Sequence, residues 1–112
     1  MELNPPVPEL PVSDVEKAQK YYCDYLGCKV EWINAGKEIG AVSNGETAIF
    51  FRRRTDVFEP VIHWVHCTDV DKSYRTLKAR GANIVDDIED KPWNLRQFTL
   101  LDLDGNVFYL HG

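Results

Sequence analysis

The chain has 112 residues, of which 44% are hydrophobic and 28% are charged, and its formal net charge is −5 with a pI of about 5.1. This length allows one domain with a real hydrophobic core, and the acidic balance disfavours nucleic acid as a partner. No apolar run approaches the roughly 18 residues of a membrane span, and the three cysteines match no zinc or disulfide spacing, so we expect a cytoplasmic protein with no membrane partner.

The first half of the chain predicts the element order β-α-β-β-β. Residues 1–11 contain four of the six prolines, which favours an extended edge strand or an arm exchanged between subunits. Ser13 and Glu16 fit a capping box, and the apolar residues that follow at helical spacing predict a helix that ends at Gly27. The remaining segments are predicted as strands, at residues 28–33, 39–42 and 47–52.

The second half predicts a diverged copy of the first. The segment Ser13-Asp14-Val15-Glu16-Lys17 recurs in altered form 55 residues later as Thr68-Asp69-Val70-Asp71-Lys72. We predict a strand at 61–67, a helix capped by Thr68, a strand at 83–85, an acidic loop at 86–90, and a hairpin of strands at 96–101 and 107–110. The repeat indicates one domain, residues 1–112, made of two units, about 1–55 and 56–112, with a ligand at the seam between them.

Several motifs resemble those of the vicinal oxygen chelate superfamily, which includes glyoxalase I, extradiol dioxygenases and bleomycin resistance proteins. The similar segments are Pro8 to Asp14, Tyr21-Tyr22, Tyr25-Leu26-Gly27, Asp69 to Asp71, Leu77 to Ala82, Pro92 to Phe98 and Asp102 to Asn106. The resemblance covers nearly the whole chain and is closest to the bleomycin resistance group. It implies an α+β fold of two βαβββ units related by a pseudo-twofold axis, a cupped sheet, and a homodimer.

The resemblance also implies where a metal would be bound, and the residues there are poor ligands. Enzymes of this superfamily hold one divalent metal on the concave face, and the corresponding positions here are Val7, Ile62 and Tyr109. Aliphatic side chains donate no lone pair, a neutral tyrosine is a poor ligand, and a catalytic site needs about three protein ligands. We therefore expect no catalytic residue, no cofactor and no metal. If the alignment is shifted by one residue, His63 takes the place of Ile62 as a candidate metal ligand.

Strand alternation predicts that the concave face carries aromatic and acidic side chains instead of metal ligands. Aromatic faces stack on planar heterocycles and attract cations, and carboxylates attract amines. Trp64 could instead fill the core, and Glu9 could pair with an arginine such as Arg96. The predicted ligand-binding residues are Glu9, Trp32, Glu38, Trp64, His66 and Tyr109.

Three hypotheses for the function follow. The first is non-catalytic binding of a bulky, planar, cationic small molecule, with sequestration of a bleomycin-type antibiotic and hence antibiotic resistance. The second is a metal-dependent lyase or dioxygenase of the glyoxalase superfamily, which the missing ligands disfavour. The third is a binding module for another hydrophobic ligand, which the sequence does not distinguish from the first.

Overall fold

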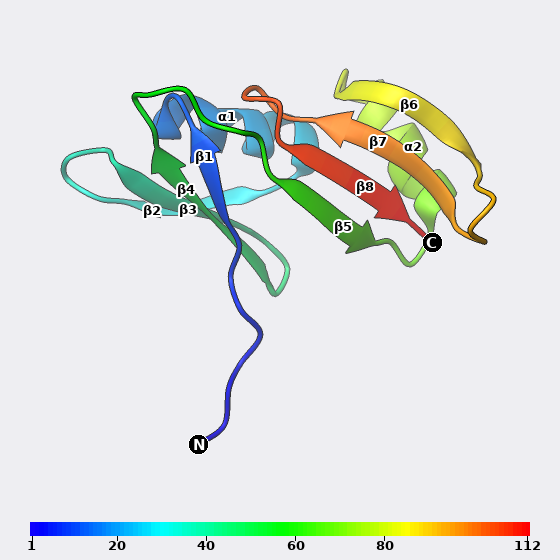
Figure 1. Ribbon diagram of the computed structural model, residues 1–112, viewed down its shortest axis with the longest axis horizontal. Helices are drawn as coiled ribbons and strands as arrows, with labels where there is room; N and C mark the ends of the chain where they lie inside the picture. The colour runs from blue at the N-terminus through cyan, green and yellow to red at the C-terminus, as the bar shows by residue number, and fades with distance from the viewer.

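The computed structural model describes residues 1–112 and contains two βαβββ units, one for each half of the chain (Figure 1). The first unit consists of β1 (Glu9–Val12), α1 (Val15–Leu26), β2 (Lys29–Ile33), β3 (Ile39–Asn44) and β4 (Thr47–Arg53). The second consists of β5 (Ile62–His66), α2 (Val70–Ala79), β6 (Asn83–Asp90), β7 (Arg96–Leu101) and β8 (Val107–His111). The predicted α+β fold with its repeat is confirmed. Neither helix is long and apolar enough to cross a membrane.

The two sheets have the same topology. The strand order is β1-β4-β3-β2 in the first sheet and β5-β8-β7-β6 in the second. In each sheet the first strand of the unit pairs in parallel with the last strand, and the other pairs are antiparallel. Each unit therefore places its first strand at one edge of its sheet.

Both helices begin one residue later than the capping prediction. The N-cap of α1 is Asp14, whose side chain accepts a hydrogen bond from the backbone N–H of Lys17 at 2.9 Å, and Asp69 caps α2 in the same way. The prediction of Ser13 and Thr68 as caps is wrong. A carboxylate satisfies the free N–H groups and also interacts favourably with the positive end of the helix dipole.

The acidic segment after Val85 is a strand and not the predicted loop. β6 continues to Asp90 and pairs with β7 through two register irregularities. Lys91 forms ion pairs with Asp86, at 2.8 Å, and with Glu89. This cation offsets the repulsion between carboxylates that would otherwise oppose strand pairing.

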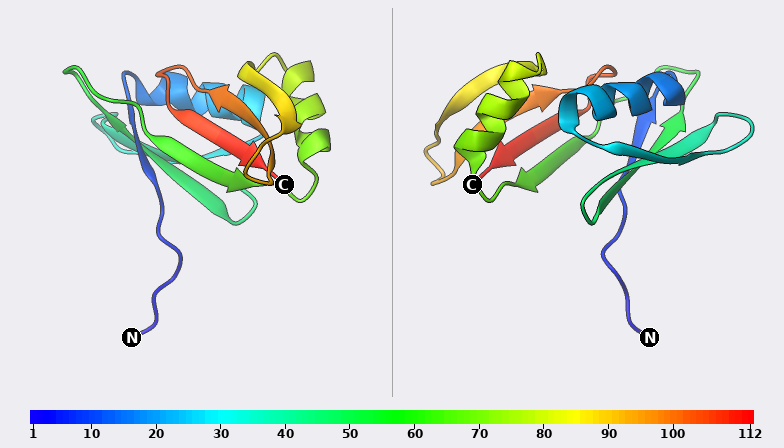
Figure 2. Two further views of the ribbon diagram at one scale, coloured as in Figure 1. Left: turned by 45° about the vertical axis from the view of Figure 1, so that its right-hand side comes forward. Right: turned by 180° about the vertical axis from the view of Figure 1, so that it is seen from behind.

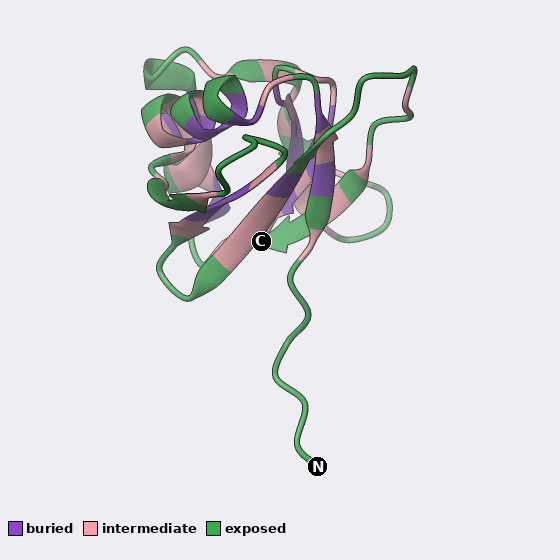
Figure 3. Cartoon of the chain, turned by 90° about the vertical axis from the view of Figure 1, so that its left-hand side faces the viewer, coloured by how far each residue is buried: buried purple, intermediate pink, exposed green.

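One hydrophobic core joins the two units. Both helices lie on the same side of the sheets (Figure 2), and the buried segments lie where helices meet strands (Figure 3). Tyr22 of α1 contacts Phe51 of the first sheet and Phe108 of the second, with ring centroids 4.8 Å and 6.0 Å away. Its hydroxyl donates to the buried Asp102 carboxylate at 2.6 Å, so α1 connects the sheets by packing and by hydrogen bonding.

The N-terminal arm, residues 1–8, extends away from both sheets before β1 begins (Figure 1). Seven of its eight residues are exposed. The prediction of an edge strand ending at Val12 is confirmed, whereas exchange of the arm between subunits stays a prediction.

Candidate functional site

Each sheet has an inner face that packs on the helices and an outer face that points away from them. In the second sheet, Phe98, Leu100, Phe108 and Leu110 belong to the buried core and define the inner face. The register pairs Trp64 with Tyr109, and Tyr109 with Thr99, so these three side chains lie on the outer face.

The outer face of the second sheet carries a row of aromatic rings. The ring of Trp64 lies 4.7 Å from that of Tyr109 and 6.0 Å from that of His111, and His66 lies 5.6 Å from His111. Trp64 is 56% exposed, so the alternative that it fills the core is wrong. The structure thus brings together three predicted site residues, namely Trp64, His66 and Tyr109.

Two further residues lie beside this aromatic row. Trp93, in the loop between β6 and β7, donates from its Nε1 to Oε1 of Gln97 at 3.0 Å and remains 54% exposed. Gln97 pairs in register with His111 and therefore lies on the outer face. Neither residue was among the predicted ligand-binding residues. Alternation along β7 places Gln97 with Thr99, but the fixed position of Trp93 depends on the loop.

His111 adds an unsatisfied polar atom to the same face. Its Nδ1 is buried and has no hydrogen-bond partner, although its ring contacts Trp64 and His66. A buried polar atom without a partner costs free energy.

The outer face of the first sheet carries a second, smaller group. Trp32 packs edge-on against Phe50 with ring centroids 5.1 Å apart, and Phe50 pairs in register with Glu9. Arg52 donates from its Nε to Oε1 of Glu9 at 2.9 Å. The suggested pairing of Glu9 with Arg96 is wrong, because Arg96 instead binds the carboxylates of two other residues, Asp71 and Asp90.

Glu38 lies outside both groups. It is exposed, precedes β3, and accepts no hydrogen bond on its side chain, while its backbone N–H donates to Oδ1 of Asn34 at 2.8 Å. On the neighbouring strand, Glu31 accepts a hydrogen bond from the Ser43 hydroxyl at 2.6 Å, which lowers the pKa of that carboxyl. Glu31 is thus the carboxylate that a hydrogen bond fixes on the sheet, whereas Glu38 lies just before the first residue of β3.

No hydrogen bond, ion pair or aromatic contact joins the two outer-face groups within the chain. Glu9 and Trp32 belong to the first sheet, whereas Trp64, His66 and Tyr109 belong to the second. Within one chain, the two groups therefore lie on separate sheets and make no direct contact with each other.

The donor set does not fit the metal that the resemblance implies. Val7 and Ile62 are exposed aliphatic residues, and Tyr109 packs against Trp64. Nowhere in residues 1–112 do three His, Cys, Asp or Glu side chains come together in an arrangement that could hold a metal ion. His63 points to the inner face and stacks on Phe108 at 5.1 Å, so it does not replace the missing ligands.

Comparison with known proteins identifies the superfamily that the sequence motifs resemble, and it identifies solved structures with the same fold. The model of the Glyoxalase/Bleomycin resistance protein/Dioxygenase superfamily matches residues 6–110. The uncharacterized protein YraH of Bacillus subtilis (strain 168) is 27% identical over 116 residues, covering 89% of this chain and 91% of its own length. Two solved structures share the fold. TioX from Micromonospora sp. ML1 has a TM-score of 0.82 at 22% identity, covering 96% of this chain and 98% of its own. A bleomycin-binding protein complexed with bleomycin has a TM-score of 0.84 at 19% identity, covering 97% of this chain and 98% of its own.

Proposed function

The chain belongs to the glyoxalase/bleomycin resistance protein/dioxygenase superfamily, and we propose that it binds a bulky, planar, cationic small molecule without converting it chemically. A bleomycin-type antibiotic is the ligand that we favour, with sequestration giving resistance to the host cell. The observation that carries this proposal is the exposed aromatic row on the second sheet, where Trp64 and Tyr109 lie side by side. Such a row stacks on a flat heterocycle and attracts positive charge.

Polar groups next to the aromatic row would orient the ligand. His66, whose ring lies 5.6 Å from that of His111, would hydrogen-bond to the ligand. On the first sheet, Glu9 and Glu31 supply negative charge, although Arg52 and Lys29 partly neutralise them. The carboxylates therefore favour a cation weakly, and stacking provides most of the proposed affinity.

We propose that the protein is a homodimer with its ligand between subunits. The outer face of the first sheet of one subunit would lie opposite the outer face of the partner's second sheet, so that the two outer-face groups would form one site. The exposed apolar residues on these faces support this arrangement, because Ile62 is 57% and Trp64 is 56% exposed.

All three cysteines are unpaired, which supports the expected cytoplasmic location.

The test is a titration of bleomycin followed by intrinsic tryptophan fluorescence and by calorimetry. The wild-type protein is expected to show quenching, and Trp64→Ala is expected to weaken binding by about 1–3 kcal/mol through loss of stacking. Leu103→Ala, at an exposed residue in the turn between β7 and β8 and outside the aromatic row, is the control and should bind like the wild type. Absence of binding to the wild-type protein at about tens of micromolar would remove the proposal.

A further inference from the structure

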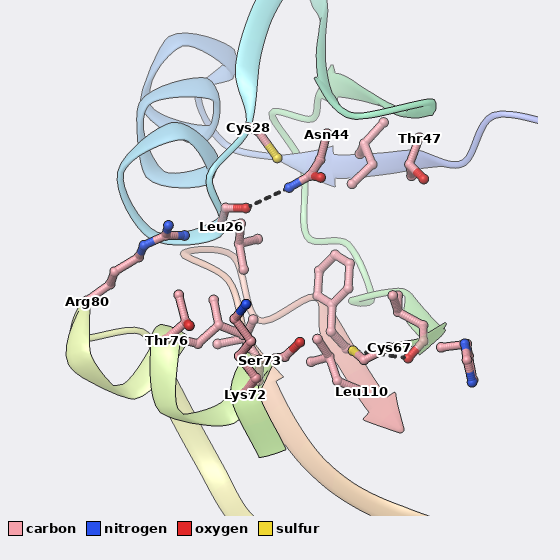
Figure 4. A pocket seen from close by; sticks show the side chains of 16 residues that line it. Leu26, Cys28, Asn44, Thr47, Cys67, Lys72, Ser73, Thr76, Arg80 and Leu110 are labelled. Atoms are coloured by element: carbon pink, nitrogen blue, oxygen red, sulfur yellow. Dashed lines mark hydrogen bonds between the residues drawn. The ribbon is translucent and has the colours of Figure 1, made fainter. Parts of the chain in front are cut away.

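A separate hollow, which we call the inter-unit cleft, opens between the two units on the helix side of the molecule (Figure 4). Its volume is about 460 Å³, which is within the range of small-molecule pockets. One wall comes from the end of α1 and from the β3–β4 hairpin, and includes Leu26, Asn44 and Thr47. The other wall comes from α2, the end of β5, and the inner face of the second sheet.

The floor of the inter-unit cleft is apolar. Nine of the sixteen lining residues are hydrophobic. Leu26 and Ile49 of the first unit lie across the cleft from residues of the second, including Leu77, Leu100 and Phe108. The side chains of the protein do not fill this cleft. An apolar ligand group of similar shape would be removed from water on binding there, which is favourable.

The rim of the cleft is cationic. Lys72 lies in the first turn of α2, Arg80 is the C-cap of that helix, and Thr76 lies between them in the sequence. No Asp or Glu is among the sixteen lining residues. Neither cation forms an ion pair. Arg80 donates from Nη1 to the backbone oxygen of Tyr25 at 3.3 Å, which fixes it at the rim while its other nitrogens stay free. In a chain of net charge −5, this uncompensated positive rim favours an anion.

We propose that the inter-unit cleft binds a monoanionic amphiphile of the medium-chain carboxylate class. The apolar chain would lie on the floor, and the carboxylate would interact with Lys72 and Arg80. Cys28, which also lines the cleft, does not oppose this, because burial raises the pKa of its thiol to about 11 and keeps it neutral at physiological pH. This ligand differs in charge from the cationic molecule proposed for the outer faces, and of the residues proposed to bind that molecule only His66 also lines the cleft.

The first experiment is a titration of the full chain with decanoate, followed by two-dimensional amide NMR. Decanol and decyltrimethylammonium, which have the same chain length, are the comparison probes. Decanoate is expected to shift the amide signals of Leu26, Ile49 and Thr76 and to leave the indole signals of the three tryptophans unchanged. Stronger binding of the cationic probe, or shifts centred on the indole signals, would overturn the proposal.

The second experiment tests the charges of the rim. The double variant Lys72→Gln/Arg80→Gln is expected to bind decanoate about tenfold more weakly and to bind decanol unchanged. Arg75→Gln/Lys78→Gln removes the same charge from the same helix, at positions that do not line the cleft, and should keep the wild-type affinity. Equal losses in the two double variants, or no binding of decanoate to the wild-type protein, would show that the cleft is not this site.

Discussion

At the scale of single residues, His63 shows how the inner face constrains a polar side chain. Its ring stacks on Phe108 at 5.1 Å with an interplanar angle of 20°, and its Nδ1 is buried without a hydrogen-bond partner. Burial lowers the pKa of His63, against smaller opposing effects of the Val107 backbone and Asp102. The neutral ring is therefore the form that fits the folded chain.

This burial predicts acid sensitivity of the fold. The unfolded chain protonates His63 first as the pH falls below about 6.5, because the folded-state pKa is lower than the unfolded value. Protonation of His63 therefore does not reduce the free energy of unfolding above that pH. Below it, the free energy of unfolding decreases as the pH falls toward the folded-state pKa. Urea unfolding at pH 7.5 and pH 5.5 should show a smaller drop for His63→Leu than for the wild type. An equal drop in both proteins would contradict the assignment.

The candidate site was only partly predictable from single residues. Alternation along β5 and β8 was enough to place Trp64 beside Tyr109, because both strands are regular and pair in parallel. The position of Trp93 was not predictable, since it depends on a tight loop in which Asn94 has a φ of 66° and Lys91 donates to the Leu95 carbonyl oxygen. Such loop conformations follow from backbone geometry that no periodicity encodes.

At the scale of elements, the close approach of α1 to β3 depends on Gly40. A Cβ built on Gly40 would lie 2.7 Å from Cγ1 of Val15 and 2.8 Å from Nε2 of Gln19. Gln19 is itself fixed, because it donates from Nε2 to the Trp32 carbonyl oxygen at 2.8 Å. The helix and the sheet therefore fit together only if this strand position has no side chain.

Gly40→Ala is expected to reduce the free energy of unfolding by about 1–3 kcal/mol, because the helix must move away from the sheet. Gly36→Ala is the matched control, since the nearest atom there is the end of the flexible Glu38 side chain at 3.0 Å. Chemical denaturation of both variants checks this. A loss for Gly36→Ala as large as that for Gly40→Ala would contradict the packing argument.

The elements were more predictable than their ends. The apolar residues of α1, including Val15, Ala18 and Tyr22, recur at helical spacing, so the helix was evident from the sequence. Its cap was misplaced by one residue because Ser13 and Asp14 are both good capping residues, and the sequence does not show which side chain reaches the free N–H groups. The acidic part of β6 was missed because carboxylates have low strand propensity, and only pairing with β7 and with Lys91 stabilises it.

At the scale of the whole molecule, the two outer faces determine how the proposed site is assembled. The repeat produces two sheets of the same topology, but the outer-face group with Trp32 and the outer-face group with Trp64 are not in contact within one chain. A dimer in which these faces meet would contain two ligand sites, each with residues from both subunits. We propose that the arm, residues 1–8, which precedes β1, would hold such a partner.

A complementation experiment tests this shared site most directly. Trp32→Ala and Trp64→Ala are each titrated calorimetrically with bleomycin, separately and after the two variants have been unfolded and refolded together. If each site takes Trp32 from one subunit and Trp64 from the other, the mixed dimers contain one intact site, and the mixture should recover a fraction of sites with wild-type affinity. A mixture that binds no more tightly than the separate variants would contradict a ligand site shared between subunits.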